Sequence, residues 1–342
     1  MAAGPVPRGV ARAADAALEA SVVASFGRPG YLVRRALYGW GPPASDGAGR
    51  VAVVTGASSG IGRAVAESLV RSRWSVVAVS RDPGRNAACV DELRAIAAGD
   101  RDAGRVTGAV ADLSDLGEVR ELGSALRAEH VRLDALVHDA GVLHRTFHRT
   151  DQGFEATFAL HVLGPTLLSA LLLDLLRAAG ASGAGSRVVT VSSGGMYPSR
   201  LDLERLEHAA PASYHGAVAY SLAKRAQVEL GVEWARRLAR TGVVALTMHP
   251  GWVATRSLDA GLPAFAQAAR GLLRSPEQGA DTAIWLACAP REEVAGGGFY
   301  LDRRPRALHL APWTRTTAVE RSRALDRVAT LAGADVPSAT GR

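Results

Sequence analysis

A glycine-rich turn between a short apolar run and an amphipathic segment limits most strongly how this chain can fold. Residues 51–55 are apolar and short enough for a buried strand, and residues 61–71 repeat apolar positions at helical spacing. Between them, Gly56 suits a tight turn, while Gly60 and Gly62 let the backbone approach a bound group closely. This order of strand, turn and helix predicts the first βα unit of a parallel sheet.

The same alternation of strand and helix continues through most of the chain. Further strands are expected at residues 75–80, 105–110, 133–138, 187–192, 243–248 and 298–301. Further helices are expected at residues 86–98, 116–129, 152–163, 166–179, 218–240 and 277–287. The sequence therefore predicts an α/β fold of the Rossmann type, a doubly wound parallel sheet of about seven strands with helices on both faces.

The two ends of the chain differ in composition from this α/β region, because Ala, Arg, Gly and Pro dominate the first 50 residues. We predict an N-terminal helical extension with a linker, one Rossmann domain and a C-terminal tail, at residues 1–50, 51–312 and 313–342. Within the two ends, short helices are expected at residues 14–26, 31–40 and 318–331, and the linker at 41–49.

Composition and charge exclude several classes of protein. The net charge of +7 comes from arginines scattered among acids, and aromatic residues make up only 5% of the 342 residues, which argues against nucleic-acid binding. Cys89 and Cys288 stand far apart and outside any CxxC pattern, so neither a disulfide framework nor a cysteine zinc site is expected. The sequence contains no run of about 18 apolar residues, and we expect a cytoplasmic protein.

The turn after the first strand has the form of a dinucleotide-binding loop. Phosphate groups bind well at the start of the following helix, where free N–H groups and the helix dipole favour anions. The loop residues expected to hold the cofactor are Thr55, Gly56, Ser58, Ser59, Gly60, Ile61 and Gly62. After the second strand an acid would hold the ribose 2′-OH of NAD, whereas an arginine accommodates the 2′-phosphate of NADP. Arg81 and Arg63 favour NADP(H), while Asp82 leaves NAD(H) as the alternative.

Lysine is almost missing from the chain, and the position of the one that remains points to chemistry. Of the 40 lysine and arginine residues only Lys224 is a lysine, and it follows Tyr220 by four positions. That spacing is one helical turn, so the ammonium and the phenol share a face. A compact ammonium beside a phenol favours the phenolate, so we expect the pKa of Tyr220 to be lowered from its usual ~10.

Four motifs together resemble the short-chain dehydrogenase/reductases. They are the loop at 55–62, the pair Tyr220 and Lys224, the sequence Val-Ser-Ser at 191–193, and Pro-Gly at 250–251. The resemblance extends over residues 51–310, most of the chain. One branch, dehydrogenase/reductase family member twelve and its bacterial relatives, looks closer still, on segments at 26–31, 191–196, 248–252, 275–282 and 299–305.

The resemblance implies roles for individual residues. Ser193 would hydrogen-bond the substrate carbonyl or hydroxyl, Tyr220 would be the general acid or base, and Lys224 would also hold the nicotinamide ribose. Asp112 and Leu113 would touch the adenine. The residues implied beside the adenine ribose are Asp139, Ala140 and Gly141, and those at the nicotinamide end are Pro250, Gly251, Val253 and Thr255.

Two positions depart from the family pattern. Asp139 stands where the family has Asn, and an ionised carboxylate only accepts hydrogen bonds, whereas an amide also donates. His161 stands where the family uses an Asn that kinks a helix and anchors a relay water; we expect an altered but working, pH-shifted relay, with lost activity as the alternative. His138, His144 and His148 lie nearby in sequence without an acidic partner pattern, so we interpret the histidines as loop and helix-surface residues and expect no metal.

These residues predict an oxidoreductase that transfers hydride between NADP(H) and an alcohol/carbonyl pair. Residues 257–273 are apolar with few charges, so as a lid they would favour an apolar small molecule; alternatively they only pack on the sheet. The competing interpretation is an NADP(H)-binding regulatory or scaffold protein with weak or no catalysis, supported by Asp139 and His161.

Two helical segments suggest further partners, a membrane surface and a second copy of the chain. The aromatics and arginines of residues 31–40 suit a weak peripheral membrane contact, although packing on the domain is the simpler expectation. The leucine-rich segment 166–179 needs cover on more than one side, and the family resemblance suggests that it pairs with its copy in a homodimer.

Overall fold

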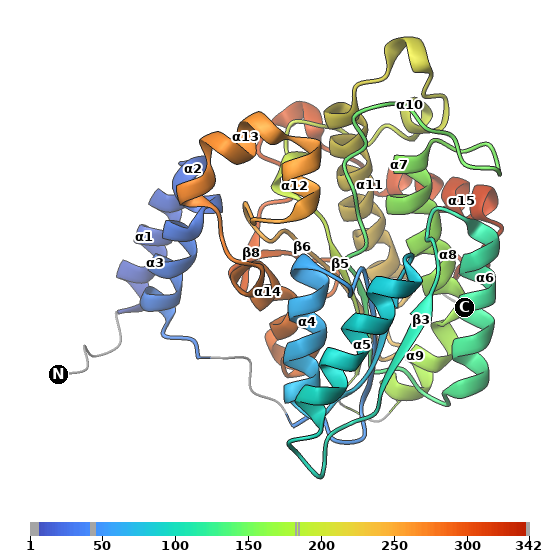
Figure 1. Ribbon diagram of the computed structural model, residues 1–342. Coiled ribbons are helices and arrows are strands. Elements are labelled where there is room, and N and C mark those ends of the chain that lie inside the picture. The colour runs from blue at the N-terminus through green and yellow to red at the C-terminus, as the bar shows by residue number, and fades with distance from the viewer. Residues whose placement is uncertain (1–6, 42–45, 182, 184, 340–342) are drawn as a thin grey trace.

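An eight-stranded sheet lies at the centre of the part of the chain that the computed structural model describes, residues 7–41, 46–181, 183 and 185–339 (Figure 1). The strand order is β3-β2-β1-β4-β5-β6-β7-β8, and only β7 and β8 pair antiparallel. The strands are β1 Val51–Thr55, β2 Ser75–Ser80, β3 Val106–Val110, β4 Ala135–His138, β5 Ser186–Val191, β6 Val243–Met248, β7 Phe299–Leu301 and β8 Arg304–Arg306. The predicted Rossmann-type fold is confirmed, with one strand more than expected.

Helices cover both faces of this sheet, as the alternating sequence pattern predicts. One face carries α4 Gly60–Arg71, α5 Pro83–Ala97 and α14 Pro276–Cys288. The other carries α6 Leu116–Glu129, α8 Gly164–Leu171, α9 Leu173–Gly180 and α11 Gly216–Arg237. Successive side chains of a strand point to opposite faces. Ala52 and Val54 therefore enter the core beneath α4, α5 and α14, and Val53 enters the core beneath α6, α8, α9 and α11. The remaining helices are α1 Arg8–Glu19, α2 Val22–Phe26, α3 Arg28–Tyr38, α7 Ala156–Phe158, α10 Leu203–Glu207, α12 Arg256–Gly261, α13 Pro263–Ala268 and α15 Ala318–Ala332.

The strand that the sequence did not predict is β8. It returns from β7 through Asp302 and Arg303, which have φ angles of 52° and 54°, as a two-residue type I′ hairpin requires. Glycine or asparagine normally marks such a turn, and neither is present here. Asp302 is instead held by ion pairs with Arg34 and Arg274, at 2.8 and 2.6 Å, from distant parts of the chain. No local signal predicts this turn, because tertiary contacts stabilise it.

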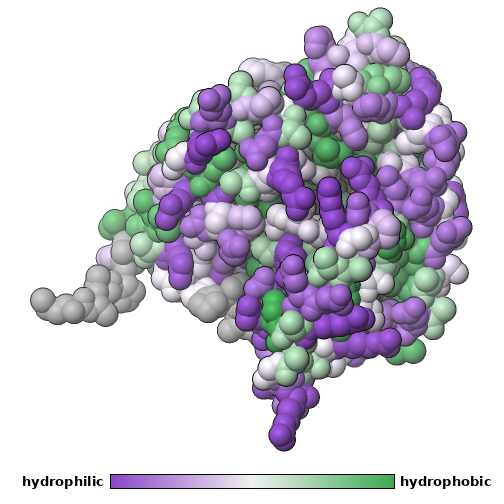
Figure 2. Space-filling view, viewed as in Figure 1, coloured by the Kyte–Doolittle hydropathy of each residue, from purple (hydrophilic) through white to green (hydrophobic). Residues whose placement is uncertain are grey.

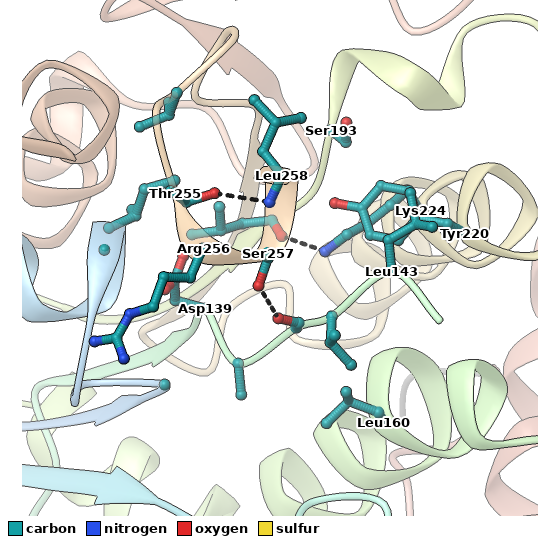
Figure 3. Close-up of a pocket in the computed structure, with 18 of the residues that line it drawn as sticks. Asp139, Leu143, Leu160, Ser193, Tyr220, Lys224, Thr255, Arg256, Ser257 and Leu258 are labelled. Carbon is teal, nitrogen blue, oxygen red and sulfur yellow. Dashed lines mark hydrogen bonds between the residues drawn. The ribbon is translucent and has the colours of Figure 1, made fainter. Parts of the chain in front are cut away.

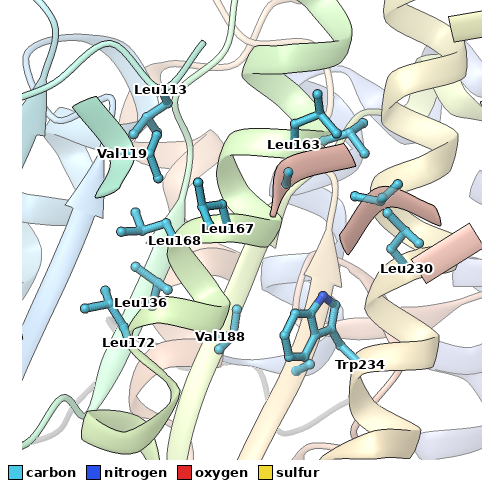
Figure 4. Close-up of a cluster of buried hydrophobic side chains, with 14 of the residues drawn as sticks. Leu113, Val119, Leu136, Leu163, Leu167, Leu168, Leu172, Val188, Leu230 and Trp234 are labelled. Carbon is cyan, nitrogen blue, oxygen red and sulfur yellow. The ribbon is translucent and has the colours of Figure 1, made fainter. Parts of the chain in front are cut away.

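The leucine-rich segment expected at 166–179 is broken into α8 and α9, which meet at Leu172. Five of its seven leucines are buried and two, Leu171 and Leu175, are partly buried, in the core that α6, α11, the sheet and the C-terminal helix α15 share (Figure 4). The apolar circumference therefore needs no second copy for cover, and the homodimer stays a prediction. Across the described ranges, no single helix is long and apolar enough to cross a membrane, although 156–171 and 173–180, bent by 57°, pass that test as a pair.

The N-terminal extension forms three helices that lie beside β8 and α13 (Figure 1). The helix expected at 14–26 is interrupted, because Ser21 caps α2 by accepting a hydrogen bond from Ala24 N–H at 3.3 Å. The aromatic residues of the segment 31–40 pack inward, under Arg274, Arg303 and Arg304. Within the expected linker, residues 42–45 lie outside the described residues. The domain boundaries at 50 and 312 stay predictions.

Candidate active site

A cavity of about 910 Å³ opens at the carboxyl ends of the parallel strands, where the strand order reverses between β1 and β4. Most residues that the sequence assigned to a site line it. These are Gly56, Ser58, Ser59, Gly60, Ile61, Arg81, Asp82, Asp112, Leu113, Asp139, Ala140, Gly141, Ser193, Tyr220, Lys224, Pro250, Gly251, Val253 and Thr255. Three assigned residues, Thr55, Gly62 and His161, are buried and do not line the cavity.

The glycines after β1 form a cradle that a side chain would fill. Gly56 has a φ of 72°, and a Cβ there would come within 2.9 Å of the Ala140 backbone. A Cβ on Gly62 would come within 2.6 Å of the Gly56 carbonyl oxygen. Gly60, with a φ of 58°, begins α4, whose N-terminus has no side-chain cap. An uncapped helix N-terminus beside a cavity suits a phosphate group, so this loop fits a dinucleotide.

Thr55 ties the loop after β1 to the loop after β4. Its hydroxyl accepts hydrogen bonds from the N–H groups of Asp139 at 3.1 Å and Ala140 at 3.2 Å. The same hydroxyl donates to the Val137 carbonyl at 3.3 Å. The sequence assigned Thr55 to the cofactor itself, but its buried position makes it a support for residues that line the cavity.

The end of β2 presents guanidinium groups to the cavity. Arg81 and Arg85 both line it, whereas Arg63 is turned toward Glu92, with an Nη2–Oε2 distance of 2.9 Å. The expectation that Arg63 supplies the second guanidinium is therefore wrong, and Arg85 takes that place. Asp82 also lines the cavity, but its carboxylate accepts the hydrogen bond from Arg85 N–H at 2.8 Å and caps α5.

Ser193, Tyr220 and Lys224 meet on one side of the cavity (Figure 3). Tyr220 and Lys224 lie one turn apart on α11, and the Lys224 Nζ is 5.4 Å from the centre of the phenol ring. Lys224 Nζ donates a hydrogen bond to the Val191 carbonyl at 2.9 Å. Ser193 follows the same strand, β5, and its hydroxyl accepts from Gly195 N–H at 3.0 Å. The carboxyl end of β5 therefore holds both Lys224 and Ser193.

The pKa values in this cluster differ from the sequence-based expectation. Burial raises the pKa of the Tyr220 phenol to about 12, while a hydrogen bond with Ser193 lowers it and negative charge on Asp139 raises it. Burial lowers the pKa of Lys224 to about 8, against the opposing effect of Asp139. Lys224 loses its proton before Tyr220 does, so its charge cannot stabilise the phenolate. The expectation of a lowered Tyr220 pKa is wrong for this structure, because desolvation outweighs the ammonium.

Asp139, the first departure from the family pattern, is an unusual carboxyl group. Burial raises its pKa to about 7, while the charge of Lys224 and a hydrogen bond from Gly62 N–H lower it. A large share of Asp139 is therefore protonated at neutral pH. A protonated carboxyl group both donates and accepts, as the amide of Asn does, so the substitution keeps more of the hydrogen-bonding capacity than an ionised Asp would.

His161, the second departure, is fully buried in a π-helical turn, Ala159–Leu163. The helix expected at 152–163 begins only at Ala156, where Glu155 caps it, and this turn supplies the kink. His161 Nε2 donates to the Val142 carbonyl at 3.0 Å, and the imidazole ring lies edge-on to the Tyr220 ring at 5.4 Å. Burial, with the charge of Lys224, holds the pKa of His161 well below its usual range. His161 is thus neutral, and the expected pH shift through its titration is wrong.

Gln227, which the sequence analysis did not single out, is buried behind the cavity and supports the His161 turn. Its Nε2 donates to the His161 carbonyl at 2.9 Å. It lies seven residues after Tyr220 on α11, so helical spacing alone placed it on the same face.

His138 does not lie at the surface, where the sequence analysis expected it. It is buried on β4, and its Nε2 lies 2.8 Å from the Ser169 hydroxyl. Among the residues in the described ranges, no three His, Cys, Asp or Glu side chains gather as a metal site would require.

One part of the cavity lining is apolar. Leu258, Leu262 and Phe265, from α12, the turn after it and α13, form this part together with Trp252. The Trp252 and Phe265 rings meet edge to face, with centroids 5.0 Å apart. Of the segment 257–273, the cavity is lined by Ser257, Leu258, Leu262 and Phe265, whereas Leu272 is 37% exposed, so the lid stays a prediction.

Comparison with known proteins agrees with this geometry. Residues 50–202 match the family model described as short chain dehydrogenase. A Streptomyces sp. (strain C5) protein provisionally named daunorubicin C-13 ketoreductase DnrU is 37% identical over 264 residues, 77% of this chain and 87% of that protein. Dehydrogenase/reductase SDR family member 12 of Bos taurus is 34% identical over 273 residues, 79% of this chain and 81% of that protein, in line with the branch that the motifs resemble.

Solved structures show the same fold. The Pseudomonas aeruginosa RhlG/NADP active-site complex superposes with a TM-score of 0.60 at 26% identity, covering 74% of this chain and 94% of that one. The fold, the cradle, the Ser193, Tyr220 and Lys224 cluster and these relatives agree. The chain therefore belongs to the short-chain dehydrogenase/reductase family.

Proposed function

We propose that this protein is an NADP(H)-dependent oxidoreductase that interconverts an alcohol and a carbonyl on an apolar small molecule. One observation carries the proposal: the hydroxyl groups of Ser193 and Tyr220 and the only lysine of the chain meet in one cavity with the glycine cradle. Membership of the family supports chemistry at a carbon that carries an alcohol or carbonyl oxygen.

The residues of the chain divide the chemical work in a simple way. NADP(H), when bound, supplies or accepts the hydride. The loop at 56–62 would hold its phosphates, and Lys224 and the Pro250–Gly251 turn would hold its nicotinamide end. Ser193 hydrogen-bonds the substrate oxygen, and Tyr220 gives the proton during reduction. Because burial raises the pKa of Tyr220 to about 12, the phenol holds its proton at neutral pH and is available as the general acid for carbonyl reduction.

The preference for NADP(H) is supported by the end of β2. Arg81 and Arg85 line the cavity where a 2′-phosphate would lie, and guanidinium groups bind phosphate through paired, charge-assisted hydrogen bonds. Asp82, the acid that would favour NAD(H), already accepts the hydrogen bond that caps α5. The solved relative named above also has NADP in its active site.

An apolar substrate is supported by the apolar part of the cavity lining. Leu258, Leu262, Phe265 and Trp252 offer aromatic and aliphatic surface beside Ser193 and Tyr220. A pocket of this kind holds a hydrophobic body and leaves a single polar group to be oriented by hydrogen bonds. The DnrU relative is named for a reaction at a ketone, which agrees with carbonyl reduction here.

The test is a comparison of purified wild type with Tyr220→Phe. With NADPH and a panel that includes decanal and 2-acetylnaphthalene, we expect wild type to oxidise NADPH and Tyr220→Phe to lose at least about 100-fold in rate. Tryptophan quenching should show that both bind NADPH. Tyr300→Phe, which changes a buried tyrosine outside the cavity lining, is the matched control. Tight NADPH binding without turnover, unchanged by Tyr220→Phe, would support the nucleotide-binding scaffold instead.

We also propose a weak peripheral contact with anionic lipid, through residues other than the aromatics at 31–40. Apolar side chains gather over the N-terminal helices (Figure 2). Those between 41% and 58% exposed are Val10, Val22, Val23, Leu32 and Val33. Exposed arginines on the same helices are Arg12, Arg28 and Arg35. An apolar face with cationic neighbours suits an anionic membrane surface.

Co-sedimentation with phosphatidylserine vesicles tests this contact. Wild type should pellet with the vesicles at low salt, and a variant with Val22→Asp and Val23→Asp should remain in the supernatant. Val131→Asp, at a valine that is 88% exposed elsewhere, is the control for added charge. Equal partitioning of all three proteins would remove the membrane contact.

A further inference from the structure

The N-terminal extension packs against the loop after β6, which lines the active-site cavity. The Phe26 carbonyl accepts a hydrogen bond from Trp252 N–H at 2.8 Å, and Arg274 N–H donates to the Trp252 carbonyl at 2.7 Å. A Cβ on Gly251, whose φ is 77°, would come within 2.4 Å of the Phe26 carbonyl oxygen. The segment around Phe26 therefore acts as an extra backbone partner for the turn that carries Pro250 and Gly251.

The Phe26 side chain touches a second part of the site. Its ring lies so close to Gly194, the residue after Ser193, that a Cβ there would meet the ring at 2.4 Å. The same ring contacts His249 edge-on at 4.6 Å and Trp252 at 6.2 Å between centroids. Phe26 is 7% exposed. One side chain from outside the predicted Rossmann domain thus lies against both turns at the reacting end of the cavity.

A buried ion cluster fixes the backbone of this segment. The Arg34 guanidinium makes five hydrogen bonds, to Asp15, Glu19, Asp302, the Ser25 hydroxyl and the Ser25 carbonyl. These use every donor that an arginine has. The cluster joins α1 and α3 to the β7–β8 turn.

Arg274 completes the cluster on the opposite side. It donates to the Phe26, Gly27 and Ser25 carbonyls at 2.9, 3.2 and 3.0 Å. It also pairs with both carboxylate oxygens of Asp302, at 2.6 and 3.0 Å. Arg34, Arg274 and Asp302 are each at most 1% exposed. Buried, fully bonded groups of this kind hold one geometry, because any shift leaves a charge without its partner.

We infer that Phe26 is a positioning residue for the reaction, and that Arg34, Arg274 and Asp302 hold it in place. Through Trp252 and Gly251 it sets the turn at the nicotinamide end, and through Gly194 it sets the turn that carries Ser193. This inference rests on the proposed function, and it gives the N-terminal extension a part in the active site. A small displacement of either turn would move reacting groups out of line, which can cost about 100-fold in rate.

The test compares two ligands that differ only at the nicotinamide. Phe26→Ala should bind NADPH about tenfold more weakly than wild type, a change of about 1.4 kcal/mol, and should bind 2′-phospho-ADP-ribose within about twofold. Turnover should fall by about 10- to 100-fold, mainly in kcat. Phe26→Leu, which keeps most of the apolar volume, should show the same pattern more weakly and serves if Phe26→Ala does not fold. Arg34→Lys, which keeps the charge but loses the fork of donors, should follow Phe26→Leu.

Leu93→Ala is the control for lost packing. Leu93 is fully buried on α5 in the other core and does not line the cavity. This variant should lose stability but keep the wild-type ratio of the two affinities and the wild-type kcat. If Phe26→Ala and Phe26→Leu weaken both ligands equally, or neither, the inference is overturned while the proposed function stands. A wild type that binds neither ligand overturns the proposed function, and the inference with it.

Discussion

At the scale of the residue, three titratable groups share one desolvated site and move one another's pKa values. Burial raises the pKa of Asp139 to about 7 and that of Tyr220 to about 12, and it lowers the pKa of Lys224 to about 8. Each of these shifts is toward the neutral form, as expected when desolvation outweighs pairing. Near neutral pH, Asp139 is partly protonated, Lys224 mostly keeps its charge and the Tyr220 phenol keeps its proton.

The Asp139 pKa predicts a change in how stability depends on pH. Its folded-state value of about 7 is above the ordinary 3.8, so the folded chain holds this proton more tightly than the unfolded chain. The resulting stabilisation is present below about pH 4 and is lost as the pH rises to 7. Asp139→Asn should therefore gain free energy of unfolding relative to wild type between pH 4 and 7, on the scale of about 1.4 kcal/mol per pKa unit.

Urea unfolding of both proteins at several pH values measures this difference. Asp174→Asn is the control, because the Asp174 side chain is 89% exposed. Profiles of wild type and Asp139→Asn that run parallel from pH 4 to 8 would contradict a raised Asp139 pKa.

The guanidinium groups at the end of β2 predict which cofactor each variant loses. Arg81→Ala and Arg85→Ala should each weaken NADPH binding by about tenfold, the effect of losing about 1.4 kcal/mol, and should leave NADH binding nearly unchanged. Arg63→Ala should affect neither, since Arg63 pairs with Glu92 outside the cavity lining. Fluorescence titration with both cofactors measures the ratio, and an equal loss for NADPH and NADH would contradict the assignment.

At the scale of the element, the helix that carries the catalytic pair, α11, packs on the C-terminal helix α15. On one side, α11 carries Tyr220 and Lys224 into the cavity lining and Gln227 to the His161 carbonyl. Its opposite side packs on α15, whose Leu325 and Val328 enter the same core. A capping box starts α15: Thr317 accepts from Glu320 N–H at 3.2 Å, and Glu320 accepts from Thr317 N–H at 2.7 Å. The stability of the C-terminal helix therefore bears on the helix that holds the catalytic pair.

Removing this cap is expected to destabilise the protein modestly. Thr317→Ala deletes the side-chain half of the capping box and should lower the free energy of unfolding by about 1 kcal/mol. Thr316→Ala, one residue earlier and outside the box, is the matched control. Equal midpoints for the two variants in urea unfolding would show that the box contributes nothing.

Elements with a local signal were predictable from the sequence, and elements held by distant contacts were not. The parallel strands and α6 follow from apolar runs and helical spacing, and their predicted bounds lie within two residues of those observed. The β8 turn and the inward packing of α3 depend on Asp302 and Arg274, from distant parts of the chain, and no local pattern marked the break at Leu172. For the site, motif spacing predicted Ser193, Tyr220 and Lys224. It did not predict that Arg85 lines the cavity in place of Arg63, because Arg63 is held by Glu92 from another turn of α5.

At the scale of the whole molecule, both ends of the chain pack on the α/β domain. The N-terminal helices contact the loop after β6, and α15 covers the leucine-rich face of α8 and α11. The family resemblance suggested that the segment 166–179 pairs with a second copy; α15 packs on α8 in this segment, and the homodimer stays a prediction.

Deletion of residues 316–342 tests what α15 covers. The truncated chain should expose the leucines of α8 and α11 and self-associate, because a large exposed apolar patch favours association. Light scattering at one protein concentration should show more chains per particle for the truncated protein than for the full-length protein. No difference in association between the two would mean that α15 does not shield this face.

The central claim is that Tyr220 passes a proton to a carbonyl oxygen while a hydride passes from NADPH to the carbonyl carbon. The most direct measurement uses NADPH deuterated at the transferred position of the nicotinamide, with 2-acetylnaphthalene and decanal as acceptors and mass spectrometry of the products. We expect one deuterium in the alcohol formed by wild type and by Tyr300→Phe, and at least about 100-fold less of this alcohol from Tyr220→Phe over the same time. Deuterated alcohol at the wild-type rate from Tyr220→Phe, or none from an NADPH-saturated wild type with any carbonyl compound, would contradict it.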